Sequence, residues 1–299
     1  MMSPATPHAP HAQSPKELIE QALTAIAARV SLRELDSPSS HTVVMAAGLD
    51  DPTVAASLAQ YAVGFLAGWV AKDATISARL GMRGVDKRDE LRTLVEGLVT
   101  PPLGMNEDQL RHWRQTSRDP WIAEVLTHAL LVIRRTVVSD CLRGDVVALL
   151  RPHPHPKRQG LDSVAIYRDA DLAVIAIGET KATKSRGSEE LTRACDMFDS
   201  VDAGAMGPDL RDAIDLLADV LPADLIEQVS EDLWRDHRCY LPAIVHEDGF
   251  DASGSRERLE RLVPPVARKR LLVLRLTDFA RFFDTIASLM PASIDVLVV

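Results

Sequence analysis

Residues 161–182 read LDSVAIYRDADLAVIAIGETKA, and this stretch predicts the core of the fold. Two runs rich in Val, Ile and Ala flank a short polar segment, which is typical of two β-strands joined by a turn. Side chains two residues apart on a strand point to the same face, so Glu179 and Lys181 project together from the end of the second strand. The hairpin can bring Asp162, at the start of the first strand, up beside them.

Two carboxylates and an ammonium group at one place are costly for a folded protein unless they have a use. Carboxylate oxygens are the ligands that hard divalent cations prefer, and a lysine beside them can act on a water molecule or a developing charge. The sequence therefore predicts a metal site formed by Asp162 and Glu179, with Lys181 next to it.

The composition limits the protein class. The chain has 299 residues, 46% of them hydrophobic but only 4% aromatic, so its core consists mainly of Ala, Val, Leu and Ile. Three scattered cysteines, Cys141, Cys195 and Cys239, form no CxxC pair, which favours a reducing, cytoplasmic location over a disulfide or zinc framework. We expect Cys195 to be a small buried apolar residue, although a reactive thiol is the alternative.

The net charge of −9 is not that of a general nucleic-acid binder. The region around the predicted site differs, because residues 151–193 contain eight Lys or Arg and six Asp or Glu. This local excess permits contacts with phosphate; ordinary solvated charges are the alternative interpretation.

We expect no signal peptide and no membrane span. Residues 1–13, MMSPATPHAPHAQ, lack a basic start and an apolar stretch. Residues 52–71 carry no charge, but Val54, Leu58 and Phe65 recur at helical spacing, which favours a helix buried in the protein core. The organisation expected is a disordered tail over residues 1–15, a mainly helical N-terminal region over 16–118 and an α/β domain over 119–299.

Six segments have the apolar, β-branched character of strands. They are Thr42–Ala47, Asp145–Leu150, Asp162–Arg168, Leu172–Thr180, Cys239–His246 and Arg270–Leu276, with Arg168–Asp171 as the hairpin turn. Helices are expected after residues that commonly cap helix N-termini. These caps are Ser14 (with Glu17 in a capping box), Asp51, Asp86, Asn106, Asp119, Ser188 and Asp278. Two further helices are expected near Pro208–Val220 and Pro222–Arg235.

The helix that begins at Asp119-Pro120 carries Glu124 in its first turn, within a largely apolar surface. One interpretation is that Glu124 stabilises the positive end of the helix dipole. The other depends on a family resemblance of the strands that follow.

Asp162, a hydrophobic strand pair and Glu179-Thr180-Lys181 together resemble the PD-(D/E)xK nuclease superfamily, with Leu161 in place of the leading proline. The resemblance implies a restriction-endonuclease-like mixed sheet flanked by helices. It implies that Asp162 and Glu179 bind Mg²⁺ or Mn²⁺, with the Thr180 carbonyl and Glu124 as further ligands, and that Lys181 assists the attack of water on a phosphodiester. The expected catalytic residues are Asp162, Glu179, Lys181 and Glu124.

The order of elements also resembles the effector nuclease subunit of Hachiman-type anti-phage systems, which works beside a helicase subunit. This implies a DNA nuclease in bacterial defence that a helicase or ATPase partner controls, in agreement with the negative net charge. Basic residues near the motif are expected to contact the nucleic-acid backbone without reading its sequence. They are Arg158, Lys184, Arg186 and Arg193.

Three other interpretations stay open. His153 and His155 form an H-x-H pair that could bind zinc, although no third ligand accompanies it and a polar loop is favoured. The chain could be an inactive nuclease fold that acts as a scaffold or binding subunit. Finally, Glu179 and Lys181 could form a simple salt bridge at the end of a strand in an unrelated α/β domain.

Overall fold

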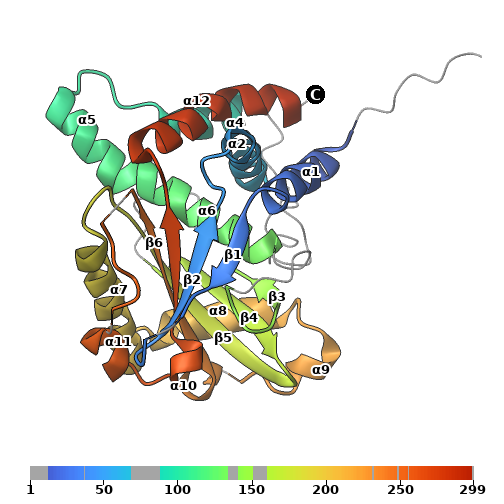
Figure 1. Cartoon of the computed structure of the whole chain (residues 1–299). Coiled ribbons are helices and arrows are strands. Elements are labelled where there is room, and N and C mark those ends of the chain that lie inside the picture. Colours follow the sequence, from blue (N-terminus) through green and yellow to red (C-terminus); the bar gives the residue numbers. More distant parts are fainter. Residues whose placement is uncertain are drawn as a thin grey trace, which may run out of the picture.

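The computed structural model describes residues 13–36, 38–68, 88–133, 141–150, 160–230, 232–247, 249–254 and 256–297. Asp86, Arg158, the His153 and His155 pair and most of the expected tail lie outside these residues. In the part that is described, one mixed sheet carries helices on both faces (Figure 1). The predicted class, an α/β protein with a mixed sheet flanked by helices, is therefore confirmed.

The sheet has the strand order β1-β2-β7-β6-β5-β4-β3. Its central strands β2, β7, β6 and β5 run parallel to one another, whereas β1, β4 and β3 add antiparallel pairs at the two sides. The strands are β1 (Ser31–Glu34), β2 (Thr42–Ala47), β3 (Asp145–Leu149), β4 (Ser163–Asp169), β5 (Leu172–Ala182), β6 (Arg238–His246) and β7 (Arg270–Arg275).

The six predicted strands are all present, with ends shifted by at most two residues. The hairpin turn is shorter than expected, because Asp169 still pairs with Leu172 and only Ala170 and Asp171 form the turn. Ala170 has a positive φ of 54° there. Strand β5 is longer than expected and ends at Ala182, beyond the Glu179 and Lys181 pair.

Strand β1 was not predicted. It is four residues long and mostly exposed. Its sequence, SLRE, lacks the alternation of apolar and polar residues that marks a half-buried strand. Glu34 at its end accepts a hydrogen bond from the guanidinium of Arg270, a buried residue of β7, at 3.0 Å. Strands β1 and β2, from the expected N-terminal helical region, thus belong to the same sheet as the strands that carry the predicted site.

The helices divide into two layers, each with its own core. The first layer packs on the face of the sheet to which Val174 and Ala176 point, and it consists of α1 (Pro15–Ala27), α2 (Pro52–Leu66), α4 (Arg88–Val99), α6 (Asp119–Ile133) and α12 (Phe279–Leu297). The second layer packs on the face of Ile175 and Ile177 and consists of α7 (Gly187–Asp202), α8 (Gly207–Ala218), α9 (Ala223–Ile226), α10 (Leu233–Asp236) and α11 (Glu257–Arg261). A short 3-10 helix, η4 (Val266–Arg268), precedes β7.

Most predicted helix caps are confirmed. The Ser14 capping box, Asp51 and Asn106 each accept a backbone N–H in the first turn, and Asp278 accepts from the N–H of Arg281. Ser188 is different: α7 begins one residue earlier, at Gly187, with no side-chain cap. The segment expected as one helix near Pro222–Arg235 forms the two short helices α9 and α10.

Helix α6 begins at Asp119, as predicted, but Asp119 does not stand at a free helix N-terminus. Helix α5 (Glu107–Trp113) continues through a π-helical segment, η2 (Arg114–Arg118), directly into α6. A proline inside an α-helix clashes with the carbonyl four residues earlier and lacks the N–H that would bond to it. A π-helical turn widens the backbone and can accommodate such a defect, and η2 lies immediately before Pro120. The continuous helix places Glu124 in the second turn of α6, away from any free N-terminus, so support of the helix dipole does not explain it.

Helix α2 lies in the core, as predicted for the uncharged segment that contains it. It also helps to place α6, because the Tyr61 hydroxyl of α2 is hydrogen-bonded to Nδ1 of His128 of α6 at 2.7 Å. Among the residues that the structure describes, no helix combines the length and the apolar character needed to cross a bilayer.

Candidate active site

The predicted site forms where two neighbouring strands separate. The ladder between β4 and β5 ends at the pair Ser163 and Gly178. Strand β5 continues for four more residues, 179–182, and among the described residues these pair with β6 alone, on their other side. On the side that β4 has left, the backbone N–H of Thr180 donates to Oδ2 of Asp162 at 2.7 Å. The Asp162 carboxylate thus satisfies a strand N–H that has no ladder partner, and this contact fixes its position.

Glu179 and Lys181 extend from the same face of β5, as predicted. The Lys181 ammonium donates a hydrogen bond to Oε1 of Glu179 and forms an ion pair with it. Glu179 is only 7% exposed, and its second oxygen, Oε2, is buried without a hydrogen-bond partner among the described residues. A buried carboxylate oxygen without a partner is unfavourable, and a cation is the kind of ligand that would compensate it.

Helix α6 brings Glu124 to the same place. Thr180 of β5 donates a hydrogen bond from its hydroxyl to the hydroxyl of Thr127 at 3.2 Å, which ties the strand end to the helix one turn after Glu124. Glu124, Asp162, Thr180 and Lys181 all line one cleft with a volume of about 650 Å³. Sequence reasoning had identified these residues, and the structure brings them together.

Close placement of these charges shifts the pKa values of the groups. Burial, Asp162 and Glu179 raise the pKa of the Glu124 carboxyl to about 9. Burial and Glu179 raise the pKa of Asp162 to about 7, although the Thr180 N–H and the Lys181 ammonium act in the opposite direction. Burial alone would lower the pKa of the Lys181 ammonium, but the carboxylates around it, Glu179 above all, outweigh burial and raise it. The site is therefore an excess of buried acid that one lysine only partly neutralises.

These donors fit a hard divalent cation. Mg²⁺ is usually held in proteins by one or two carboxylates together with water and substrate oxygens. Asp162 and Glu179 could supply the carboxylates. The N–H and the carbonyl of one strand residue point to the same edge, so the Thr180 carbonyl also faces the side that β4 has left. Within the described ranges, no three His, Cys, Asp or Glu side chains already stand as a ready-made metal cluster.

Three of the four basic residues expected to contact nucleic acid line the same cleft: Lys184, Arg186 and Arg193. Lys184 and Arg186 follow the end of β5 and are exposed, with only long ion pairs, such as 3.4 Å from Lys184 to Glu247. Arg193 of α7 donates to Oε1 of the buried Glu190 at 2.8 Å. Arg158 lies outside the described residues.

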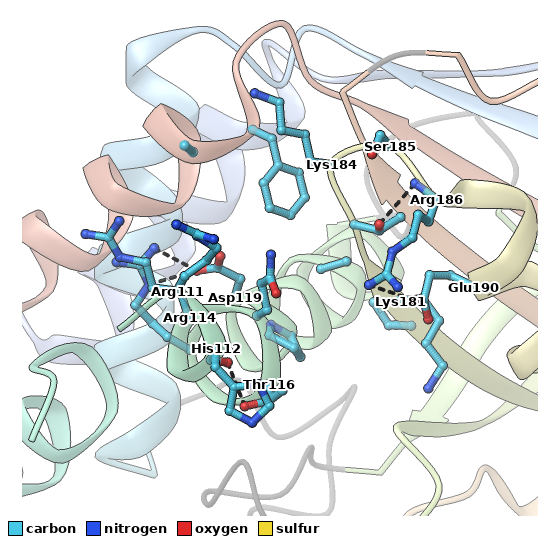
Figure 2. A pocket seen from close by; sticks show the side chains of 18 of the residues that line it. Arg111, His112, Arg114, Thr116, Asp119, Lys181, Lys184, Ser185, Arg186 and Glu190 are labelled. Atoms are coloured by element: carbon cyan, nitrogen blue, oxygen red, sulfur yellow. Dashed lines mark hydrogen bonds and ion pairs between the residues drawn. The ribbon is translucent and has the colours of Figure 1, made fainter. Parts of the chain in front are cut away.

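Sequence reasoning missed the opposite side of the cleft. Residues of α5 and η2 form it, and Figure 2 shows Arg111, His112, Arg114 and Thr116 on the side of the pocket opposite Arg186. Arg111 and Arg114 are three apart, so they share a helix face, and this spacing was a signal available in the sequence. Only the continuous α5–η2–α6 helix shows that this face belongs to the site of Glu124.

The cysteines do not contribute to this site. All three are buried and free of disulfides. Burial and the carboxylate of Asp199 raise the pKa of the Cys195 thiol to about 12, so it stays protonated at neutral pH and is not a reactive thiolate. The interpretation of Cys195 as a small buried apolar residue is thus supported.

No protein-family model matches this chain, and a comparison with curated proteins finds none of similar sequence.

Proposed function

We propose that this protein is a metal-dependent nuclease that hydrolyses phosphodiester bonds of DNA. One observation carries the proposal: Asp162, Glu179 and Glu124 meet Lys181 at the end of β5, where burial and mutual repulsion raise the pKa values of Asp162 and Glu124. Strongly perturbed carboxylates in a cleft are characteristic of sites that bind a cation or carry out acid–base chemistry.

Asp162 and Glu179 would hold Mg²⁺ or Mn²⁺, with the Thr180 carbonyl and Glu124 as further oxygen donors. Such an ion, when bound, polarises the scissile phosphate and lowers the pKa of its water. The Thr180 N–H keeps the Asp162 carboxylate in place by the 2.7 Å hydrogen bond. The hydrogen bond between the Thr180 and Thr127 hydroxyls holds the strand against the helix that carries Glu124.

Lys181 would supply a fixed positive charge to the site. Its raised pKa keeps the ammonium protonated at neutral pH, so it cannot serve as the base that removes a proton from water. A fixed ammonium can instead orient the attacking water and stabilise negative charge that develops on the phosphate. The ion pair with Glu179 holds Nζ beside the carboxylate that would bind the cation.

The resemblance stated above leads to the wider part of the proposal. The protein would serve as the effector of a bacterial anti-phage system, and a helicase or ATPase partner would control its access to DNA. The net charge of −9 supports this, because such a chain gains little from general attraction to nucleic acid. The three free cysteines support a cytoplasmic location.

The second candidate is an inactive nuclease fold that serves as a scaffold or binding subunit. The direct contact between Lys181 and Glu179 favours it, because an internal ion pair can neutralise a buried carboxylate without a metal ion. The two candidates differ in one measurable property, since only the nuclease requires a cation at Asp162 and Glu179.

A cleavage assay tests the proposal. Wild-type protein and the variants Glu179→Ala and Lys181→Ala are incubated with supercoiled plasmid, single-stranded DNA and RNA, with Mg²⁺ or Mn²⁺ and then with EDTA. The matched control is Glu227→Ala, an exposed glutamate outside the cleft. We expect DNA cleavage that requires the metal and falls roughly 10³-fold or more in both site variants but not in the control.

Calorimetry on the same samples separates a controlled enzyme from a scaffold. Metal binding that Glu179→Ala abolishes, without cleavage by the isolated wild type, would indicate an enzyme that needs its partner. A wild-type protein that neither cleaves nor binds a divalent cation would refute the proposal and leave the scaffold.

A further inference from the structure

The cleft above the carboxylates has two opposing walls of different origin. One wall comes from α5 and η2 and carries Arg111, His112 and Arg114, whereas the other comes from the loop after β5 and carries Lys184 and Arg186 (Figure 2). The wall of α5 and η2 is called the helical wall below. Sequence motifs pointed only to the second wall, so the helical wall adds a surface that the proposed function does not use.

The cations of the helical wall have donors to spare. Arg111 is 67% exposed in its side chain, and its ion pair with Asp108, at 3.4 Å, joins two exposed groups. The Arg114 guanidinium lies 3.8 Å from Asp284, and the side chain of Arg114 is 40% exposed. Exposed ion pairs contribute little stability, so these guanidinium groups can exchange their partners for phosphate oxygens at low cost.

The helical wall is firmly anchored. Arg118, at the end of η2, is 5% exposed and contacts Oδ1 of Asp119 and Oδ1 of Asp284, each at 2.7 Å. Asp284 belongs to α12 and is half-buried, so this network ties the wall to the C-terminal helix. The side chains of Arg111 and Arg114 thus stand on a fixed backbone, which reduces the entropy lost when they bind a ligand.

The charge of the cleft differs from that of the chain. The residues that line it include seven Lys or Arg and five Asp or Glu, whereas the whole chain has a net charge of −9. The acids Glu124 and Asp162 sit with Lys181 where the strands separate, and the exposed cations stand on the walls on either side. Positive charge in a cleft attracts a polyanion more strongly than the same charge on a flat surface.

The size and lining of the cleft restrict the form of the polyanion. Its volume is about 650 Å³, and Pro120, Ala182, Phe279 and Ala280 add apolar surface beside the cations. A duplex is a stiff cylinder with a persistence length of about 50 nm, so it cannot bend its phosphates into a cleft of this volume between two walls. A single strand has a flexible backbone and exposes apolar base faces as well as phosphates.

We infer that the cleft binds one single strand of nucleic acid, with Arg111 and Arg114 on its helical wall and Lys184 and Arg186 on the other contacting successive phosphates. This inference rests on the proposed function, since it places the scissile phosphate above Asp162 and Glu179. It adds the form of the substrate and a second binding surface to that function.

Binding in the absence of metal tests the inference, because no cleavage is then required. A short fluorescent oligonucleotide is titrated with protein in EDTA, and anisotropy is recorded at several salt concentrations. The arms are single-stranded DNA, the duplex of the same sequence and single-stranded RNA. The variant is Arg111→Ala/Arg114→Ala. Its control is Arg258→Ala/Arg261→Ala, two exposed arginines of α11 outside the cleft, and thermal melting checks that both variants fold.

We expect single-stranded DNA or RNA to bind more tightly than the duplex. Loss of two charged hydrogen bonds should weaken binding by roughly tenfold for each arginine removed, whereas the control should bind like the wild type. The slope of log affinity against log salt should fall by about 0.7 for each phosphate that the variant no longer binds. The preferred arm tells whether the strand is DNA or RNA.

Equal or tighter binding of the duplex would overturn the inference, and so would a helical-wall variant that binds as well as the control. These failures are separate from failure of the proposed function. Metal-dependent cleavage with binding independent of Arg111 and Arg114 would overturn only the inference. Binding that depends on these arginines without any metal binding at Glu179 would overturn only the nuclease.

Discussion

Replacing Glu124 by glutamine should stabilise the metal-free protein at alkaline pH. The folded state raises the pKa of this carboxyl from its ordinary value of 4.5 to about 9, mainly through burial and through the charges of Asp162 and Glu179. As the pH rises above 4.5, the unfolded chain releases the proton while the folded protein keeps it. Stability therefore falls with rising pH until about pH 9 is passed, and Glu124→Gln removes this contribution because an amide does not titrate.

The magnitude follows from the pH interval over which the two states differ. Each pH unit of that interval costs about 1.4 kcal/mol, so the cost at about pH 8 has an upper limit near 5 kcal/mol. The side chain of Glu124 is only partly buried, and water and nearby dipoles screen part of this cost. We expect Glu124→Gln to raise the free energy of unfolding by about 2–3 kcal/mol at about pH 8 and to change it little near pH 4.5.

Urea denaturation in EDTA at these two pH values measures the effect, with circular dichroism as the signal. The matched control is Glu96→Gln, an exposed glutamate on α4, for which we expect no difference between the two pH values. A Glu124→Gln variant that is less stable than the wild type at about pH 8, or that is equally affected at both pH values, would refute the reasoning. It would mean that the three carboxylates are not crowded in the folded protein.

Three further expectations concern the same region. Mg²⁺ should raise the melting temperature of the wild type more at about pH 8 than at about pH 6, because Asp162 must lose its proton to act as a ligand. A larger rise at about pH 6 in calorimetric scans would contradict this expectation. Gly178→Ala would place a Cβ atom 2.0 Å from the Ser163 hydroxyl and should cost about 1–3 kcal/mol in urea melts, and Ser163→Ala in the same chain should recover part of the loss. Arg118→Ala leaves the buried Asp119 carboxylate unpaired and should cost about 3–5 kcal/mol in urea melts, so a loss below about 1 kcal/mol would show that the network is not a true buried ion pair.

The sequence predicted correctly those features that depend on the periodicity of a single strand or on one capping residue. The alternation of side chains along residues 172–182 correctly placed Glu179 and Lys181 together, and the β4–β5 hairpin brought Asp162 beside them, as predicted. These features depend on neighbours within one supersecondary unit, so local rules determine them.

The features that were missed depend on segments that are distant in the sequence or on unusual backbone. Asp119-Pro120 does begin α6, as predicted, but the sequence did not show that η2 joins α6 to α5, so that the helical chain is continuous at this point. The sequence alone therefore did not assign the helical wall with Arg111 to the site. The short polar strand β1 is defined only by its pairing with β2, and no periodicity within its own four residues reveals it.

The free edge of residues 179–182 also determines when the site can form during synthesis. Because β4 stops at its pairing with Gly178, β6 is the one strand of the described residues that holds this end of β5 in the sheet. Strand β6 leaves the ribosome after α7, α8, α9 and α10. A chain made only as far as β5 can form its hairpin but cannot fix Glu179 and Lys181. The candidate active site can thus assemble only after synthesis has passed His246 and β6 has paired with β5.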